Sequence, residues 1–139
     1  MVSRVLVPMD DSAVATQALQ YALDVHPDAE ITVLHVVGTP SSMMGRAASL
    51  ALADDFEESA TEFAKPVLDA ARDVAADNDA EISTEVMTGH PARAILDRAE
   101  DFDAIVMGAH GGELVDRLIV GNVARTVFRR SPVPVTSVR

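Results

Sequence analysis

The chain contains no cysteine and only one lysine, Lys65, among its 139 residues. Without cysteine it can form neither a disulfide framework nor a thiolate metal site, and nothing indicates an oxidising compartment. No hydrophobic run approaches the roughly 20 residues of a membrane-spanning helix. The few apolar residues before Pro8 are too short for a signal peptide. We therefore expect a cytoplasmic protein with no membrane partner.

Basic residues are scarce as a group, since 11 of them face 22 acidic ones and the formal net charge is −11. This balance excludes the basic surface that nucleic-acid-binding proteins present, so we expect no nucleic-acid partner. An acidic, lysine-poor chain is typical of organisms with molar intracellular salt, where hydrated carboxylates keep the surface solvated. At about 1 M salt the Debye length is about 3 Å, so this charge would not repel an anionic ligand over long range. The alternative is an acidic protein from an ordinary organism.

Hydrophobic residues make up 48% of the chain, so disorder is not expected. The length is that of one domain, with enough residues to bury a core without metals or disulfides. No internal repeat is present. The sequence therefore predicts a single domain over residues 1–139.

Five apolar or alternating runs predict strands at 3–9, 30–37, 80–88, 102–108 and 131–138. Four helices are expected between them: one capped by Ser12, one over 60–75, one opened by Pro91 and one around 120–128. The segment 38–49 has turn residues and no periodicity, which is typical of a mobile loop. Pro66 lies inside the second helical pattern and predicts a kink or an altered start there.

Strands that alternate with helices and read as continuous apolar runs favour a parallel sheet covered on both faces. The expected fold is a Rossmann-like α/β sandwich with five parallel strands in the order 3-2-1-4-5. Pro132 and Pro134 confine the last strand to an edge. Ligands of such sheets bind beyond the carboxyl ends of the strands, where the winding reverses. "PMDDS" and "GAHGG" follow the first and fourth strands, so these two exits are the expected site.

Four of the seven glycines fall between residues 108 and 122. Glycine beside a helix N-terminus lets free backbone N–H groups approach an anion, and Asn122 can cap that helix and donate to a phosphate oxygen. The stretch matches neither G-x-x-x-x-G-K-[ST] nor G-x-G-x-x-G. It therefore predicts a phosphate-binding loop whose contacts are made mainly by backbone amides. The alternative is ordinary turn geometry.

The spacing G-x2-G-x9-G followed by a small polar residue resembles the nucleotide signature of the universal stress protein family. The resemblance extends over the whole chain, through "RVLVPMDDS", "VLHVV", "GHPARAI" and "VMGAHGG…GNVARTVFRRSPVPV". It implies a five-stranded α/β sandwich, usually dimeric through the edge of the fifth strand. In one branch of the family it implies ATP binding.

Carried over to this chain, the resemblance implies that Pro8 and Asp10 sit against the nucleoside. It implies that the Val36 backbone hydrogen-bonds the adenine edge and that Met107 lines the pocket. Five further residues are implied to hold the phosphates and the ribose: Gly108, Gly111, Gly121, Asn122 and Val123.

We therefore expect a dimeric, ATP-binding regulatory module of the stress response, with Mg²⁺ accompanying the nucleotide. Asp10 could face the ribose or help to hold Mg²⁺ through water, or it could form a polar turn before a helix. The alternative is a structural dimer without nucleotide, which Asp11 and Asn122 favour because the family commonly has glycine and serine or threonine there. His35 is expected to be a hydrogen-bonded, partly buried histidine and not a ligand. The chain has no clear nucleophile–base pair, so hydrolysis is expected to be slow at most.

Overall fold

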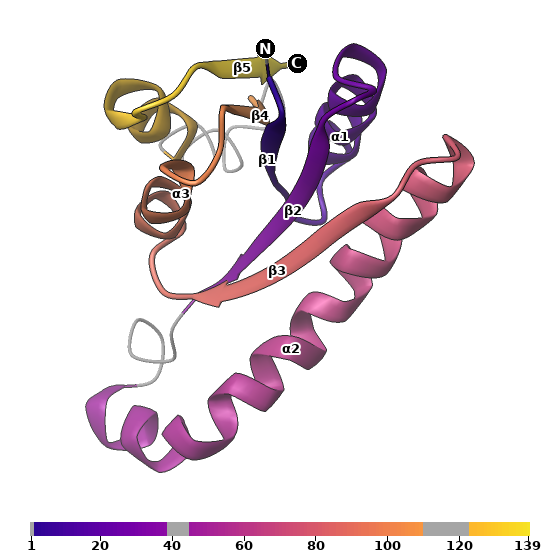
Figure 1. The fold of residues 1–139 in the computed structure, drawn as a ribbon. Helices are drawn as coiled ribbons and strands as arrows, with labels where there is room; N and C mark the ends of the chain where they lie inside the picture. Colours follow the sequence, from indigo (N-terminus) through magenta and orange to yellow (C-terminus); the bar gives the residue numbers. More distant parts are fainter. Residues whose placement is uncertain (1, 39–44, 110–122) are drawn as a thin grey trace.

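The computed structural model describes residues 2–38, 45–109 and 123–139, with the backbone alone for residues 45–59. Its five strands form one sheet in which every neighbouring pair is parallel and the order is β3-β2-β1-β4-β5, as predicted (Figure 1). The strands are β1 (Arg4–Pro8), β2 (Glu30–Val37), β3 (Ile82–Thr88), β4 (Ala104–Gly108) and β5 (Val135–Val138). The helices are α1 (Ala13–Val25), α2 (Gly45–Asp77), α3 (Pro91–Ala99) and a last one at 123–130.

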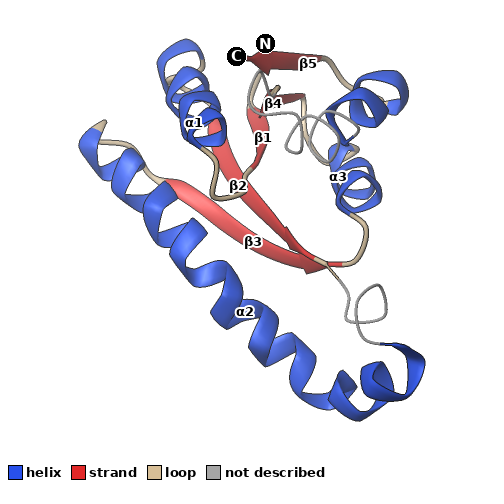
Figure 2. Ribbon diagram, turned by 180° about the vertical axis from the view of Figure 1, so that it is seen from behind, coloured by secondary structure: helices blue, strands red, loops and turns tan. Residues whose placement is uncertain are grey.

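The helices cover both faces of the sheet, with α1 and α2 on one side and α3 and residues 123–130 on the other (Figures 1 and 2). Consecutive strand residues point to opposite faces, so neighbours on β1 belong to different halves of the core. Val5 and Val7 pack toward α1 and α2, whereas Leu6 packs with Ile95 of α3. Because all three β1 residues are fully buried, this central strand gives the site a rigid base.

Helix α2 departs from the sequence prediction at its N-terminal end. It begins at Gly45, so residues 45–49 of the expected loop are helical, while 39–44 lie outside the described residues. The Ala- and Leu-rich stretch after Gly45 consists of good helix formers, which outweigh the turn residues before it. Pro66 does not start the helix either. It is exposed, and buried Ala64 and Val67 on either side hold the backbone against the sheet.

Strand β5 confirms the prediction drawn from the prolines of the last segment. It begins at Val135, directly after Pro134, and lies at one edge of the sheet. Pro134 has no N–H, but its carbonyl oxygen accepts a hydrogen bond from the Ile105 N–H at 2.9 Å. The two prolines therefore precede the β5 residues whose N–H groups donate hydrogen bonds to β4.

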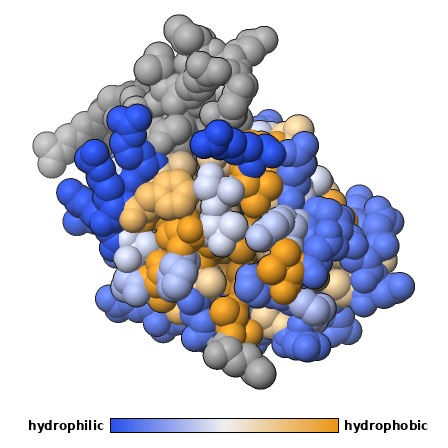
Figure 3. Space-filling view, turned by 90° about the horizontal axis from the view of Figure 1, so that it is seen from above, coloured by the Kyte–Doolittle hydropathy of each residue, from blue (hydrophilic) through white to orange (hydrophobic). Residues whose placement is uncertain are grey.

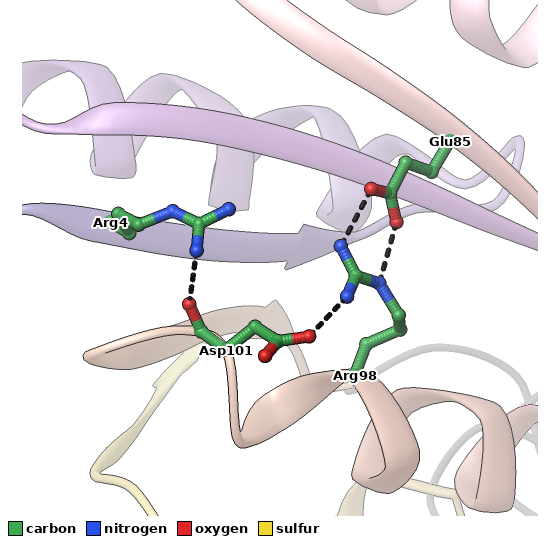
Figure 4. A network of polar contacts seen from close by, with 4 residues as sticks. All are labelled: Arg4, Glu85, Arg98 and Asp101. Carbon is green, nitrogen blue, oxygen red and sulfur yellow. Dashed lines mark hydrogen bonds and ion pairs between the residues drawn. The ribbon is translucent and has the colours of Figure 1, made fainter.

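A polar network ties α3 to the sheet (Figure 4). Arg98 donates from Nε and Nη2 to the two oxygens of Glu85 on β3, at 2.8 and 2.6 Å, and from Nη1 to Asp101 at 2.5 Å. The hydrogen bond with Glu85 is the main reason that the pKa of Arg98 is raised. Arg4 of β1 donates to the Asp101 carbonyl, and the guanidinium groups of Arg4 and Arg98 both lie over the Phe102 ring. These contacts orient α3, which forms one wall of the site.

Asp103 clamps the start of β1 and makes the stability of the fold depend on pH in the acidic range. One of its carboxylate oxygens accepts the N–H groups of Ser3 and Arg4, both at 2.9 Å, and these bonds lower the pKa of Asp103 below 3.8. A carboxyl with a depressed pKa stabilises the fold above its unfolded value and loses that effect as pH falls through the folded value. We expect the difference in unfolding free energy between wild type and Asp103→Asn to be constant from neutral pH to about 5. It should shrink below 3.8 in urea titrations, and a difference that grows there would contradict the clamp.

Candidate functional site

The carboxyl ends of β1, β2 and β4 surround one hollow on the face that α3 covers. It holds about 600 Å³ of space not filled by protein atoms, part of it open to solvent. Six of the nine residues predicted for the site line it: Pro8, Asp10, Val36, Met107, Gly108 and Val123. The other three, Gly111, Gly121 and Asn122, lie outside the described residues. The fold thus brings together every predicted residue that the structure describes.

The turn after β1 is built around Ser12, which caps α1 as the sequence predicted. The Ser12 hydroxyl oxygen accepts the Ala15 N–H at 3.2 Å. Oδ1 of Asp10 in turn accepts the Ser12 N–H at 2.9 Å and the Ser12 hydroxyl. Both hydrogen bonds go to Oδ1, and in the part of the chain that the structure describes no donor contacts Oδ2. The Asp10 carboxylate, which borders the hollow, is therefore held in place through Oδ1.

The rest of the lining is mainly apolar. Leu34 and Val36 of β2, Met107 of β4, and Pro91 and Ile95 of α3 form its floor and one side. Among the described lining residues there is no lysine or arginine. Such a hollow suits a largely apolar group held in place by a few polar contacts at its rim.

Gly108 has a packing role in addition to the one predicted from the glycine spacing. It is buried at the end of β4, and a Cβ built on it would lie 3.0 Å from the carbonyl carbon, the carbonyl oxygen and Cγ1 of Val14. Two of these atoms belong to the backbone of the first turn of α1. A side chain here would crowd the α1 backbone, so the contact between β4 and α1 favours glycine whether or not a phosphate approaches it.

Sequence reasoning missed the contribution of α3 to the site. Pro91 and Ile95 line the hollow, although the sequence pointed only to a strand-to-helix turn at Pro91. Pro91 could have indicated this contribution, because it predicts a helix that starts directly after β3. Such a helix begins at the same edge of the sheet as the exits of β1 and β4. His35 also borders the hollow, and its Nδ1 lies 2.8 Å from the Met9 carbonyl oxygen, in accord with the partly buried, hydrogen-bonded histidine expected there.

Two findings bear on metals and membranes. In residues 2–38, 45–109 and 123–139 there is no group of three or more His, Cys, Asp or Glu side chains that could hold a metal ion. Among the described helices, none is long and apolar enough to cross a membrane.

Comparisons with known proteins agree with this geometry. Residues 1–139 match the model of the Universal stress protein family. Universal stress protein YxiE of Bacillus subtilis is 28% identical over 148 residues, which cover all of both chains. The structure of universal stress protein UspA from Lactobacillus plantarum is 27% identical with a TM-score of 0.78, covering 99% of this chain and 98% of that one. A universal stress protein in complex with cAMP shares the fold at 24% identity, with a TM-score of 0.70 and coverage of 99% and 97%.

Proposed function

The chain belongs to the universal stress protein family, and we propose that it binds ATP in the hollow as a dimeric regulatory module of the stress response. The observation that carries the proposal is the position of Asp10 and Gly108. They lie 98 residues apart in the sequence, and both line one hollow at the exits of the neighbouring strands β1 and β4. Ligands of doubly wound sheets bind at such a point.

The lining supports a nucleoside with its base in the apolar part. Val36, Ile95 and Met107 offer apolar surface to a purine ring, while the Asp10 carboxylate can accept a hydrogen bond from a ribose hydroxyl. The phosphates would then extend toward Val123, the first residue of the last helix that the structure describes. Its N-terminal N–H groups and dipole favour an anion, which is also the role that the sequence assigns to Gly121 and Asn122.

Other universal stress proteins support an adenine nucleotide as the ligand class. A member of the family with this fold has been solved in complex with cAMP. We propose ATP in particular because the glycine spacing offers backbone amides for more than one phosphate. Mg²⁺ would be held mainly by the triphosphate oxygens, since the described residues supply no carboxylate cluster for it.

We propose that ATP is bound and not turned over at an appreciable rate. The Ser12 hydroxyl donates to Asp10, while Nδ1 of His35 is engaged with the Met9 carbonyl. Among the described lining residues, no serine is hydrogen-bonded to a histidine. Binding without turnover suits a regulatory module whose ATP-bound state is recognised by other molecules.

Titration calorimetry with ATP and Mg²⁺ tests the proposal. We expect wild type to bind, and Asp10→Ala to weaken binding by at least about tenfold because a charged hydrogen-bond acceptor is lost from the site. Asp11→Ala is the matched control, since it removes the same charge from the next, exposed residue. It should leave the affinity within about threefold of wild type.

A structural dimer without nucleotide is the competing function, favoured by Asp11 and Asn122 where the family commonly has other residues. It predicts no heat of ATP binding and no nucleotide in acid extracts of the purified protein. That pair of results would remove the ATP proposal.

We also propose that the protein works in the cytoplasm of an organism with molar intracellular salt. The support is the absence of cysteine together with the net charge of −11. The binding measurements therefore belong in about 1 M KCl, where the Debye length falls to about 3 Å and the acidic surface repels the triphosphate little.

A further inference from the structure

The residue after β1 is held by β2 through both of its backbone polar groups. Pro8, the last residue of β1, lies opposite Leu34 in the register of the two strands. The Met9 N–H then donates to the Leu34 carbonyl oxygen at 2.8 Å, and the Met9 carbonyl oxygen lies 2.8 Å from Nδ1 of His35. A carbonyl oxygen can only accept, so Nδ1 of His35 carries the proton. The Met9 side chain is 6% exposed and anchors the same residue in the core.

This arrangement determines where the next residue lies. The peptide that joins Met9 to Asp10 is planar, so a carbonyl directed at His35 fixes the direction in which Asp10 leaves the sheet. From there Oδ1 of Asp10 accepts the Ser12 N–H and hydroxyl, and Ser12 caps α1. A continuous chain of contacts thus runs from the His35 ring to the carboxylate that borders the hollow.

We propose that His35 is a positioning residue of the nucleotide site. Its Nδ1–H holds the Met9–Asp10 peptide, so that the Asp10 carboxylate faces the hollow before a ligand arrives. The ligand in this inference is the ATP of the proposed function, whereas the contacts of the loop stand without it. A site held ready in this way avoids the cost of ordering the loop when the nucleotide binds.

Binding measurements with matched variants test the inference. In His35→Asn the amide nitrogen lies as far along the side chain as Nδ1 and can donate to the same carbonyl, whereas His35→Leu cannot donate. We expect His35→Leu to weaken ATP binding by about tenfold, and His35→Asn to stay within about threefold of wild type. His26→Leu, at the far end of α1, is a control for losing a partly buried histidine and should bind as wild type does.

A double-mutant cycle separates positioning from general damage to the fold. If His35 acts through Asp10, then His35→Leu added to Asp10→Ala should change the affinity by less than about twofold. A full further loss in that background would mean that His35 does not act through this carboxylate, and it would overturn the proposal.

A second readout needs no nucleotide. Hydrogen exchange of the Ser12 amide, which donates to Asp10, should be at least about tenfold faster in His35→Leu and unchanged in His35→Asn, while amides of β4 keep their rates in both. Long-range ¹⁵N–¹H spectra of the wild type should show Nδ1 of His35 protonated. An unprotonated Nδ1, or a Ser12 amide that keeps its rate in folded His35→Leu, overturns the inference. Wild type that binds no ATP would refute the proposed function, but the exchange rates and the tautomer would still test the positioning role of His35. The tautomer can be measured even if His35→Leu does not fold.

Discussion

Replacing Gly108 with valine is expected to remove ATP binding and to lower the free energy of unfolding by about 3 kcal/mol. The Cβ alone would meet three atoms of Val14 at 3.0 Å, and two of them are backbone atoms. The first turn of α1 cannot move aside easily, because Ser12 caps it and Ala15 is buried against the sheet. The strain must then separate α1 from β4, and both border the hollow. Urea unfolding and calorimetry measure the two effects.

Two further variants make this expectation specific to the contact. Gly38→Ala places a Cβ in open space and should change the stability by less than about 0.5 kcal/mol. Val14→Ala should rescue Gly108→Ala only in part, because it removes Cγ1 and leaves the two backbone contacts. Full rescue would mean that the α1 backbone is not the obstacle, and Gly108→Val with wild-type binding would remove Gly108 from the site.

The strands and their order could be predicted because the sheet leaves strong marks in the sequence. The run over 30–37 coincides with β2, since a strand buried on both faces has to be apolar throughout. The prolines at 132 and 134 identified the edge strand, because an interior strand would need the N–H groups that they lack. The site region followed from topology, which brings the exits of β1 and β4 together.

The features that could not be predicted depend on contacts between distant residues. Nothing in the sequence near Gly108 shows that Val14 lies against it, and nothing near His35 shows that the Met9 carbonyl is its partner. These contacts depend on how the helices and loops pack against the sheet. The start of α2 does not follow from the apolar stripe, which begins at residue 60, because intrinsic helix propensity extends the helix back to Gly45.

The proposed dimer has a surface on this chain that suits it. The Ile105 N–H bonds Pro134 O and the Ala109 N–H bonds Val138 O, so even-numbered residues of β5 face β4. The backbone groups of Val135 and Ser137 therefore point to the free edge of the sheet, a template for another strand. Figure 3 looks down on the end of the molecule where β5 lies and shows hydrophobic side chains gathered among polar ones.

Exposed hydrophobic residues flank this edge on both sides of the sheet. Tyr21 and Val25 of α1, 39% and 48% exposed, follow Val14 by seven and eleven residues, so they share its side of the helix, which faces the end of β4. Phe128, 43% exposed, lies on the last helix, which packs on the other face of the sheet. A two-fold axis perpendicular to β5 at this edge would pair the strand antiparallel with its copy and bury these side chains against the partner.

Ser137→Pro is expected to convert the proposed dimer into a folded monomer. Proline removes the outward N–H of Ser137, and its ring obstructs an approaching strand, while the bonds of Thr136 and Val138 to β4 are kept. Sedimentation velocity should show half the wild-type mass, with a nearly unchanged urea midpoint. Ser137→Ala keeps the N–H and should remain a dimer. A folded Ser137→Pro protein that still sediments as a dimer would place the interface elsewhere, because the proline ring obstructs any strand that approaches β5.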